Sequence, residues 1–185
     1  MVITGPPGAG KTTVSRLVAR SFDPVACVIE SDWWWTTIVK GHIDAWQPEA
    51  HAQNRAVVRS FAAAAAVMAS EGFATVLEGI VGPWMLDLVV AEADEANVQL
   101  HYVVLRPTLE VALERARSRQ GDERVPGHPA LTASGPVRQL WEQFSDLGTF
   151  EPHALDNTSL GPETTAERVS ALVADAAMTV SSRAS

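Results

Sequence analysis

Two hydrophobic patterns alternate along the whole of the 185-residue chain. Short runs of apolar, largely β-branched residues indicate buried strands, and the longer amphipathic segments between them indicate helices. The runs that we expect to form strands are 1–4, 25–30, 73–79, 98–105 and 152–156. The helical patterns lie near 11–21, 48–70, 83–96, 108–120, 136–146 and 162–178. This alternation predicts an α/β fold, in which a parallel sheet carries helices on both faces and binds ligands at the carboxyl ends of its strands.

Prolines mark the starts of the predicted helices. A proline costs least in the first helical turn, where its missing N–H has no carbonyl to bond. Five of them stand at or just before such starts: Pro48, Pro83, Pro107, Pro136 and Pro162. The least regular stretch, residues 120–135, is rich in Gly, Pro, Asp and Ser. Because loops of that length usually serve a function, we expect a lid near 118–135, rather than an idle loop, within a single domain of residues 1–185.

The composition is that of an ordinary globular protein, with 46% hydrophobic and 19% charged residues. A formal net charge of −8 disfavours a duplex nucleic-acid partner, which would select a basic surface. The one cysteine, Cys27, lies in an apolar run and allows no disulfide within the chain, which suits a reducing compartment. Neither a secretory signal nor a run of about 20 apolar residues is present, so we expect a cytoplasmic protein without a membrane partner.

The chemistry of the chain is concentrated near its beginning. Gly5-Pro6-Pro7-Gly8-Ala9-Gly10-Lys11-Thr12 matches the phosphate-binding P-loop pattern G-x-x-x-x-G-K-[ST] in full, between an apolar strand and an amphipathic helix. The glycines let the loop curl so that backbone N–H groups point at phosphates, and the helix adds its positive end. A chance glycine-rich turn is the alternative, which the flanking strand and helix disfavour.

The P-loop predicts a nucleoside triphosphate, taken to be ATP, together with Mg²⁺. Lys11 is expected at the β- and γ-phosphates, and the Thr12 hydroxyl is expected to bind the metal. Pro6 and Pro7 have no N–H, so the amide donors must begin at Gly8. The residues that we expect to contact the nucleotide here are Gly5, Gly8, Ala9, Gly10, Lys11, Thr12 and Thr13.

Asp32 follows the second predicted strand, at the sheet edge where the γ-phosphate should lie. A carboxylate at that place could accept the proton of an acceptor hydroxyl or position the metal. The alternative is that Asp32 only caps a helix beginning at Trp33. We favour the catalytic and acceptor-binding interpretation.

Glu78 closes the third predicted strand, 73–79. An acid at the end of an apolar strand near a P-loop is expected to reach Mg²⁺, directly or through water, or to contact the acceptor. The sequence does not decide between these two roles. A solvated strand end is the third possibility.

Two arginines could neutralise the charge of the transferring group. Arg115 and Arg119 are four residues apart and share one face of a predicted helix. Arg115 has no acidic partner among its helical neighbours, which makes sense if an anion binds there. We expect Arg119 to assist catalysis and Arg115 to contact the nucleotide.

The run Trp33-Trp34-Trp35 is unusual, because three consecutive indoles cannot all face one core. At least one of them should line a cleft beside Asp32, and Trp33 and Trp34 are our candidates for contact with the acceptor. An acceptor with an aromatic or sugar-like ring would stack on indole. Packing alone explains the run about equally well.

With these residues identified, the chain resembles the P-loop kinases that include gluconate kinase, shikimate kinase, chloramphenicol phosphotransferase and the zeta-toxin kinases. The motifs that carry the resemblance are Gly5–Thr12, Glu30-Ser31-Asp32, Leu77–Pro83 and Leu105–Arg117. The resemblance implies a three-layer P-loop NTPase fold, with five parallel strands in the order 2-3-1-4-5 and a mobile lid.

The resemblance also implies roles for single residues. It makes Asp32 the carboxylate that activates the acceptor, places Arg115 over the adenine, and brings the segment after Asp156 to the base. Glu78 departs from the Asp common at its position. The tryptophan run matches none of the named kinases, so the acceptor is not implied.

The resulting hypothesis is an ATP- and Mg²⁺-dependent kinase that phosphorylates a hydroxyl of a small molecule such as a metabolite, sugar or antibiotic. One alternative is a polynucleotide or nucleotide kinase, which the net charge of −8 disfavours. Another is a P-loop ATPase that acts as a switch without an acceptor. The sequence leaves the oligomeric state open.

Overall fold

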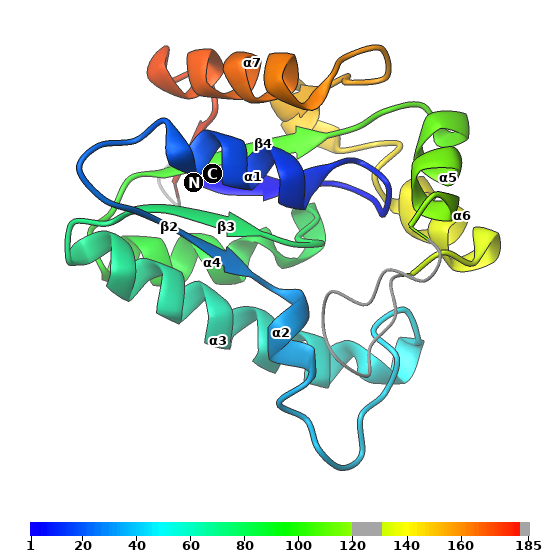
Figure 1. Ribbon diagram of the computed structural model, residues 1–185. Coiled ribbons are helices and arrows are strands. Elements are labelled where there is room, and N and C mark those ends of the chain that lie inside the picture. Colours follow the sequence, from blue (N-terminus) through cyan, green and yellow to red (C-terminus); the bar gives the residue numbers. More distant parts are fainter. Residues whose placement is uncertain (120–130, 182–185) are drawn as a thin grey trace.

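A computed structural model describes residues 1–119 and 131–181 (Figure 1). Its central sheet has the parallel strands β1 (Val2–Thr4), β2 (Ala26–Glu30), β3 (Ala74–Glu78), β4 (Leu100–Leu105) and β5 (Ala154–Leu155). Their order is β2-β3-β1-β4-β5, as expected from the resemblance, and Ile3 is in register with Glu78 and Val103. The α/β class and the strand order are therefore confirmed.

A sixth strand was not predicted. The segment 162–178 was expected to be one helix, but α7 (Pro162–Ala174) ends four residues earlier. Ala176 then takes a positive φ of 55°, which turns the chain back towards the sheet. The residues that follow form β6 (Thr179–Val180), which pairs antiparallel with the beginning of β4. The sheet described here thus has six strands rather than five.

Helices cover both faces of the sheet, which makes the molecule three-layered (Figure 1). The helices α1 (Lys11–Arg20) and α7 pack together on one face, and α3 (His51–Ser70) and α4 (Pro83–Glu95) pack together on the other. At the carboxyl ends of the strands lie α2 (Asp32–Trp35), α5 (Leu109–Arg117) and α6 (Ser134–Gln143). Two 3₁₀ turns, η1 (Pro48–Ala50) and η2 (Gly148–His153), precede α3 and β5.

The sheet separates two hydrophobic cores because successive strand residues point to opposite faces. In β1, Val2 belongs to the core under α3 and α4, and Ile3 belongs to the core under α1 and α7. Fully buried Tyr102 in β4 carries a polar group into the first core, where its hydroxyl donates to the carbonyl of Val81 at 2.9 Å. The Val81 N–H donates in turn to the Thr4 hydroxyl at 2.9 Å. These two bonds fix the loop between β3 and α4.

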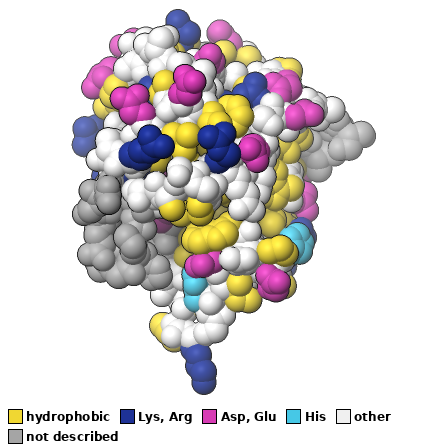
Figure 2. Space-filling model, turned by 90° about the vertical axis from the view of Figure 1, so that its right-hand side faces the viewer, with side chains coloured by type: hydrophobic (Ala, Val, Ile, Leu, Met, Phe, Trp, Pro, Cys, Tyr) yellow, Lys and Arg dark blue, Asp and Glu magenta, His cyan; other side chains and the backbone are white. Residues whose placement is uncertain are grey.

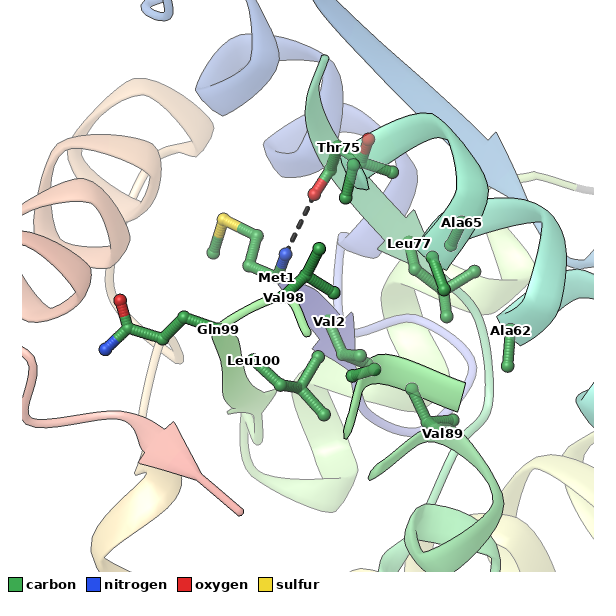
Figure 3. A pocket seen from close by; sticks show the side chains of 13 residues that line it. Met1, Val2, Ala62, Ala65, Thr75, Leu77, Val89, Val98, Gln99 and Leu100 are labelled. Carbon is green, nitrogen blue, oxygen red and sulfur yellow. Dashed lines mark hydrogen bonds between the residues drawn. The ribbon is translucent and has the colours of Figure 1, made fainter. Parts of the chain in front are cut away.

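A small cavity of about 40 Å³ lies near the start of β1, between the sheet and the helices α3 and α4 (Figure 3). Ala62, Leu77, Val89 and Leu100 point into it, so its walls are largely apolar. The Met1 amino group beside it donates to the carbonyl of Thr75 at 2.8 Å. The cavity is near the opposite end of β1 from the P-loop and is far too small for a nucleotide.

None of the helices in residues 1–119 and 131–181 is both long enough and apolar enough to span a membrane.

Candidate active site

The P-loop connects β1 to α1, and two of its glycines are required by close approach of other backbone. Gly5 has φ 142°, and a Cβ there would lie 2.2 Å from the carbonyl oxygen of Leu105. Gly8 has φ 85°, and its Cβ would lie 2.1 Å from the carbonyl oxygen of Ala112 in α5. A side chain would therefore be both strained and obstructed at either position. The loop is held directly against the end of β4 and against α5.

The loop ends where α1 begins, at Lys11. Gly10 is the N-cap with φ 90°, and its carbonyl accepts from Val14 N–H at 3.0 Å. The first N–H groups of any helix lack carbonyl partners within it, so those of Lys11, Thr12 and Thr13 form an anion site. The Lys11 Nζ lies 3.1 Å from the carbonyl oxygen of Pro6 and thus folds back over the loop. The Lys11 ammonium and the first amides of α1 thus lie on the same loop, and their contact with phosphates stays a prediction.

A cavity of about 320 Å³ opens beside the P-loop. It brings together segments that lie far apart in the sequence: the P-loop and α1, the end of α5, and the loop after β5. The lining residues are Gly8, Gly10, Lys11, Thr12, Thr13, Val14, Arg115, Ser118, Arg119, Asn157, Leu160, Pro162 and Thr165. Both predicted arginines and the segment after Asp156 therefore lie with the P-loop, in a space large enough for a ligand.

Arg115 is bonded to backbone rather than to an acid. Its Nη2 donates to the carbonyls of Asn157 and Thr158, both at 3.2 Å. The side chain thus ties α5 to the loop after β5 while it lines the cavity. Arg119, one turn further along, lines the same cavity.

Asn157 is a site residue that the sequence analysis did not identify. It is 2% exposed, and its Nδ2 donates to the carbonyl of Ala9 in the P-loop at 2.9 Å. Next to it, the Thr158 hydroxyl accepts from Thr108 N–H at 2.9 Å, at the start of α5. The polar run Asp156-Asn157-Thr158 after a strand was the available signal, but nothing in the sequence shows a contact across 148 positions.

Glu78 is buried, so the interpretation as a solvated strand end is wrong. Its side chain is 2% exposed, and its Oε1 accepts from the Thr12 hydroxyl at 3.2 Å. Its Oε2 is buried without a hydrogen-bond partner among the described residues. The pKa of Glu78 is raised to about 7, mainly by burial; the nearby Asp32 and Glu30 also raise it, while Lys11 and the hydrogen bond from Thr12 lower it.

The Thr12–Glu78 pair fits a magnesium ion. Mg²⁺ binds oxygen ligands, and the pair offers the Thr12 hydroxyl and the Glu78 carboxylate. One oxygen of that carboxylate, Oε2, has no hydrogen-bond partner among the described residues. In residues 1–119 and 131–181, no three His, Cys, Asp or Glu side chains gather into a metal site by themselves. A cation here would therefore need further ligands, which phosphate oxygens and water supply in nucleotide sites.

Asp32 lies at the same corner of the sheet. It is the first residue of α2, whose N-cap is Ser31, so it does not cap a helix beginning at Trp33. Ser31 N–H donates to the carbonyl of Glu78 at 2.9 Å, which joins the ends of β2 and β3. Glu30 is held by Arg16 from α1, with Nη2 at 2.6 Å from Oε1. Exposed Asp32 thus extends from a corner whose other two acids are fixed.

The three consecutive tryptophans separate as predicted. Trp34 and Trp35 are partly buried and pack against the core under α3 and α4, whereas Trp33 stays 48% exposed. Of the two predicted acceptor contacts, Trp33 is therefore the one with free surface. The predicted lid near 118–135 falls mostly on residues 120–130, which lie outside the described residues; Ser118 and Arg119 before them border the nucleotide-sized cavity.

Comparison with solved structures supports the fold. A sugar kinase from Janibacter sp. is 23% identical, with a TM-score of 0.61 and 97% of both chains covered. A gluconokinase from Sinorhizobium meliloti is 18% identical, with a TM-score of 0.63 and coverage of 95% of this chain and 91% of the other. The tunicamycin resistance protein of Deinococcus radiodurans is 19% identical, with a TM-score of 0.64 and 94% of both chains covered.

The predicted resemblance to small-molecule P-loop kinases is thus confirmed at the level of the fold. A search of curated proteins found no match to the sequence. A family model described as AAA domain matches residues 1–133, which include the P-loop, Asp32, Glu78 and Arg115. Because this match covers well over half of the sequence, the chain belongs to the AAA domain family.

Proposed function

We propose that the protein is an ATP- and Mg²⁺-dependent kinase that transfers the γ-phosphoryl group to a hydroxyl of a small molecule. The observation that carries this proposal is the hydrogen bond between Thr12 and buried Glu78, between the P-loop and Asp32. It joins a metal-binding donor set, a phosphate site and an exposed carboxylate at one corner of the sheet. The sugar kinase and the gluconokinase share this fold, which supports the same class of reaction.

The nucleotide is assigned to the cavity of about 320 Å³. The amides from Gly8 to Thr13 and the Lys11 ammonium hold the phosphates, and Arg119 neutralises charge on the transferring group. The base lies against Arg115, whose guanidinium is already fixed by two carbonyls of the loop after β5. A fixed guanidinium loses little freedom when a planar base stacks on it.

Thr12 and Glu78 would hold Mg²⁺, which would supply charge neutralisation on the phosphate oxygens. Asp32 accepts the proton of the acceptor hydroxyl as its oxygen attacks the γ-phosphorus, and ADP leaves with the electron pair of the broken P–O bond.

ATP turnover with and without pools of small alcohols tests the proposal. We expect slow ADP release from Mg·ATP alone, strong stimulation by at least one pool, and a phosphorylated product in its mass spectrum. Acceptor-independent turnover at the full rate would instead indicate an ATPase switch. The Lys11→Ala variant should lose several kcal/mol of transition-state stabilisation. Its matched control is Lys40→Ala, which removes an exposed lysine outside the cavity; near-normal turnover by Lys11→Ala would refute the site.

A further inference from the structure

The face at the carboxyl ends of the strands is apolar in its middle. Figure 2 shows hydrophobic side chains in a band down this face. Acidic and basic side chains both gather in its upper part, a few acidic and histidine side chains flank the lower part of the band, and a basic side chain projects at the lower tip. Two tryptophans that follow the neighbouring strands β2 and β3 keep free surface here: Trp33 is 48% exposed and Trp84 is 42% exposed. The loop between β3 and α4 adds a third apolar side chain, the partly buried Ile80.

The loop from Gly79 to Gly82 connects the two indoles to the candidate active site. At its beginning it touches the residue between Glu30 and Asp32, since a Cβ on Gly79 would lie 2.2 Å from the Ser31 hydroxyl. At its end it touches Trp84, since a Cβ on Gly82 would lie 2.1 Å from the indole ring. Trp84 is itself held by an edge-on contact with Phe144, with ring centroids 5.2 Å apart. The apolar surface therefore continues directly from the Asp32 corner.

The charges at this corner oppose an anionic acceptor. Glu30, Asp32 and Glu78 lie close enough for the first two to raise the pKa of the third. Among the described residues, three arginines from α1, the start of α3 and the residue after β4 each pair with a carboxylate. These pairs are Arg16–Glu30, Arg55–Asp87 and Arg106–Glu151. A carboxylate or phosphate on the acceptor would therefore add a further negative charge to a corner that already holds three acids.

We propose that the phosphoryl acceptor is an alcohol without a carboxylate or phosphate group that carries an aromatic or alicyclic ring, which lies against Trp33 with its hydroxyl beside Asp32. This inference rests on the kinase activity proposed above and narrows its acceptor. An indole gains most from a flat apolar ring, and the ring needs no cation to hold it. The hydroxyl is the one polar group that the corner must accept, and its proton goes to Asp32.

Three probes with the same ring test whether a negative charge on the acceptor weakens its binding. They are benzyl alcohols with a hydroxymethyl, a carboxylate or an aminomethyl group in the para position. Ligand-observed saturation-transfer NMR on the full chain, with Mg²⁺ and a non-hydrolysable ATP analogue, ranks their binding. We expect the diol and the amine each to bind about tenfold more tightly than the carboxylate, because the carboxylates at the corner repel another negative charge. Equal or tighter binding of the carboxylate than of the diol would overturn the proposal, as would no binding of the diol.

Variants locate the ring. Trp33→Ala should weaken diol binding by about tenfold, whereas Trp33→Phe should retain most of it. The control is Val67→Ala, which removes an exposed apolar side chain near the far end of α3. Unchanged diol binding in Trp33→Ala would place the acceptor elsewhere and overturn the proposal. Binding of the ATP analogue is measured separately: its absence in the unmodified protein would refute the kinase, while its presence without diol binding refutes the acceptor class alone.

Discussion

At the scale of single residues, the site consists of a few side chains with sharply different surroundings. Glu78 is buried and bonded to Thr12, whereas Asp32, on the neighbouring strand end, is exposed. Two carboxylates in such different environments are suited to different tasks, one to a metal ion and the other to a proton. Substitutions should therefore separate the two tasks.

Replacing Asp32 with Asn removes the proton acceptor but keeps size and polarity. We expect nucleotide affinity to stay within about twofold and transfer to fall by about 10²-fold or more, since general-base catalysis contributes that much. Single-turnover phosphoryl transfer and titration with a fluorescent ATP analogue measure the two quantities. Unchanged transfer with intact binding would show that Asp32 acts only at the start of α2.

The sequence identified Asp32 and Glu78 because both follow apolar runs that could only be strands. It did not identify Asn157 or the bond of Arg115 to the loop after β5, since both act through backbone carbonyls. Such contacts depend on which loops the fold brings together and leave no periodic pattern in the chain. The sequence left open whether Glu78 serves the metal or the acceptor. The observations that bear on this choice are the burial of Glu78 and its hydrogen bond with Thr12, and neither can be read from the sequence.

At the scale of elements, the P-loop is fixed by its neighbours as much as by its own sequence. Gly8→Ala places a methyl group against the Ala112 carbonyl and strains a φ of 85°. We expect a loss of about 2 kcal/mol of stability, together with weaker nucleotide binding, because loop or helix α5 must shift. Urea unfolding and nucleotide titration measure both effects.

A matched control for Gly8 is available in the chain. Gly72 has a similar φ of 91° but nothing within 4 Å of a Cβ, so Gly72→Ala pays only for the backbone conformation, about 1 kcal/mol, and leaves nucleotide binding unchanged. If the two variants lose equal stability and both bind nucleotide normally, the close approach of α5 to the P-loop does not affect nucleotide binding.

A second device joins the end of β4 to the segment before β5. Arg106 donates to both oxygens of Glu151, at 2.9 and 2.8 Å, and Leu147 N–H donates to the same carboxylate. The bond from Arg106 and then that from Leu147 hold the pKa of Glu151 down to about 2. Because the folded-state pKa lies below the ordinary value of 4.5, this stabilisation is complete above about pH 4.5 and is lost as the pH falls towards 2.

Glu151→Gln tests this device. The variant should unfold at lower urea than the unmodified protein at pH 7, and the difference should shrink below about pH 4.5. Glu92→Gln, which breaks the longer 3.5 Å contact with Arg59, serves as control and should change little at either pH. A difference that stays constant down to pH 2.5 would mean that the charge of Glu151 is not what stabilises the fold.

The elements themselves were mostly predictable, with errors where tertiary contacts decide. Strands β1 to β4 and the long helices follow from hydrophobic period and from prolines at helix starts. β5 has only two residues, Ala154 and Leu155, after a 3₁₀ turn, and β6 exists only because β4 offers it an edge. The short helix α2 was expected only as an alternative, because its three consecutive tryptophans show no helical hydrophobic period.

At the scale of the whole molecule, the nucleotide cavity links three separate segments, so a bound nucleotide should stabilise the entire fold. A non-hydrolysable ATP analogue with Mg²⁺ at about 100 times its Kd should add roughly 2.7 kcal/mol, which raises the Tm by about 5–10 °C for a chain of this size. Differential scanning calorimetry measures the shift. The same analogue should shift Lys11→Ala far less, and an equal shift would place its binding outside the P-loop.

The strand order could be predicted only from the resemblance to known kinases and not from the hydrophobic pattern. Periodicity alone predicts a parallel sheet covered on both sides but does not order its strands, because order depends on which crossovers pack best. The region expected to act as a lid centres on residues 120–130, so its role stays a prediction.

The antiparallel strand β6 has a practical consequence. It anchors the C-terminal part of the chain to the beginning of β4, and the end of β4 meets Gly5 of the P-loop. Removing residues from Thr179 onward would therefore leave the first half of β4 with an open edge. It would thereby weaken the strand whose end packs against the P-loop.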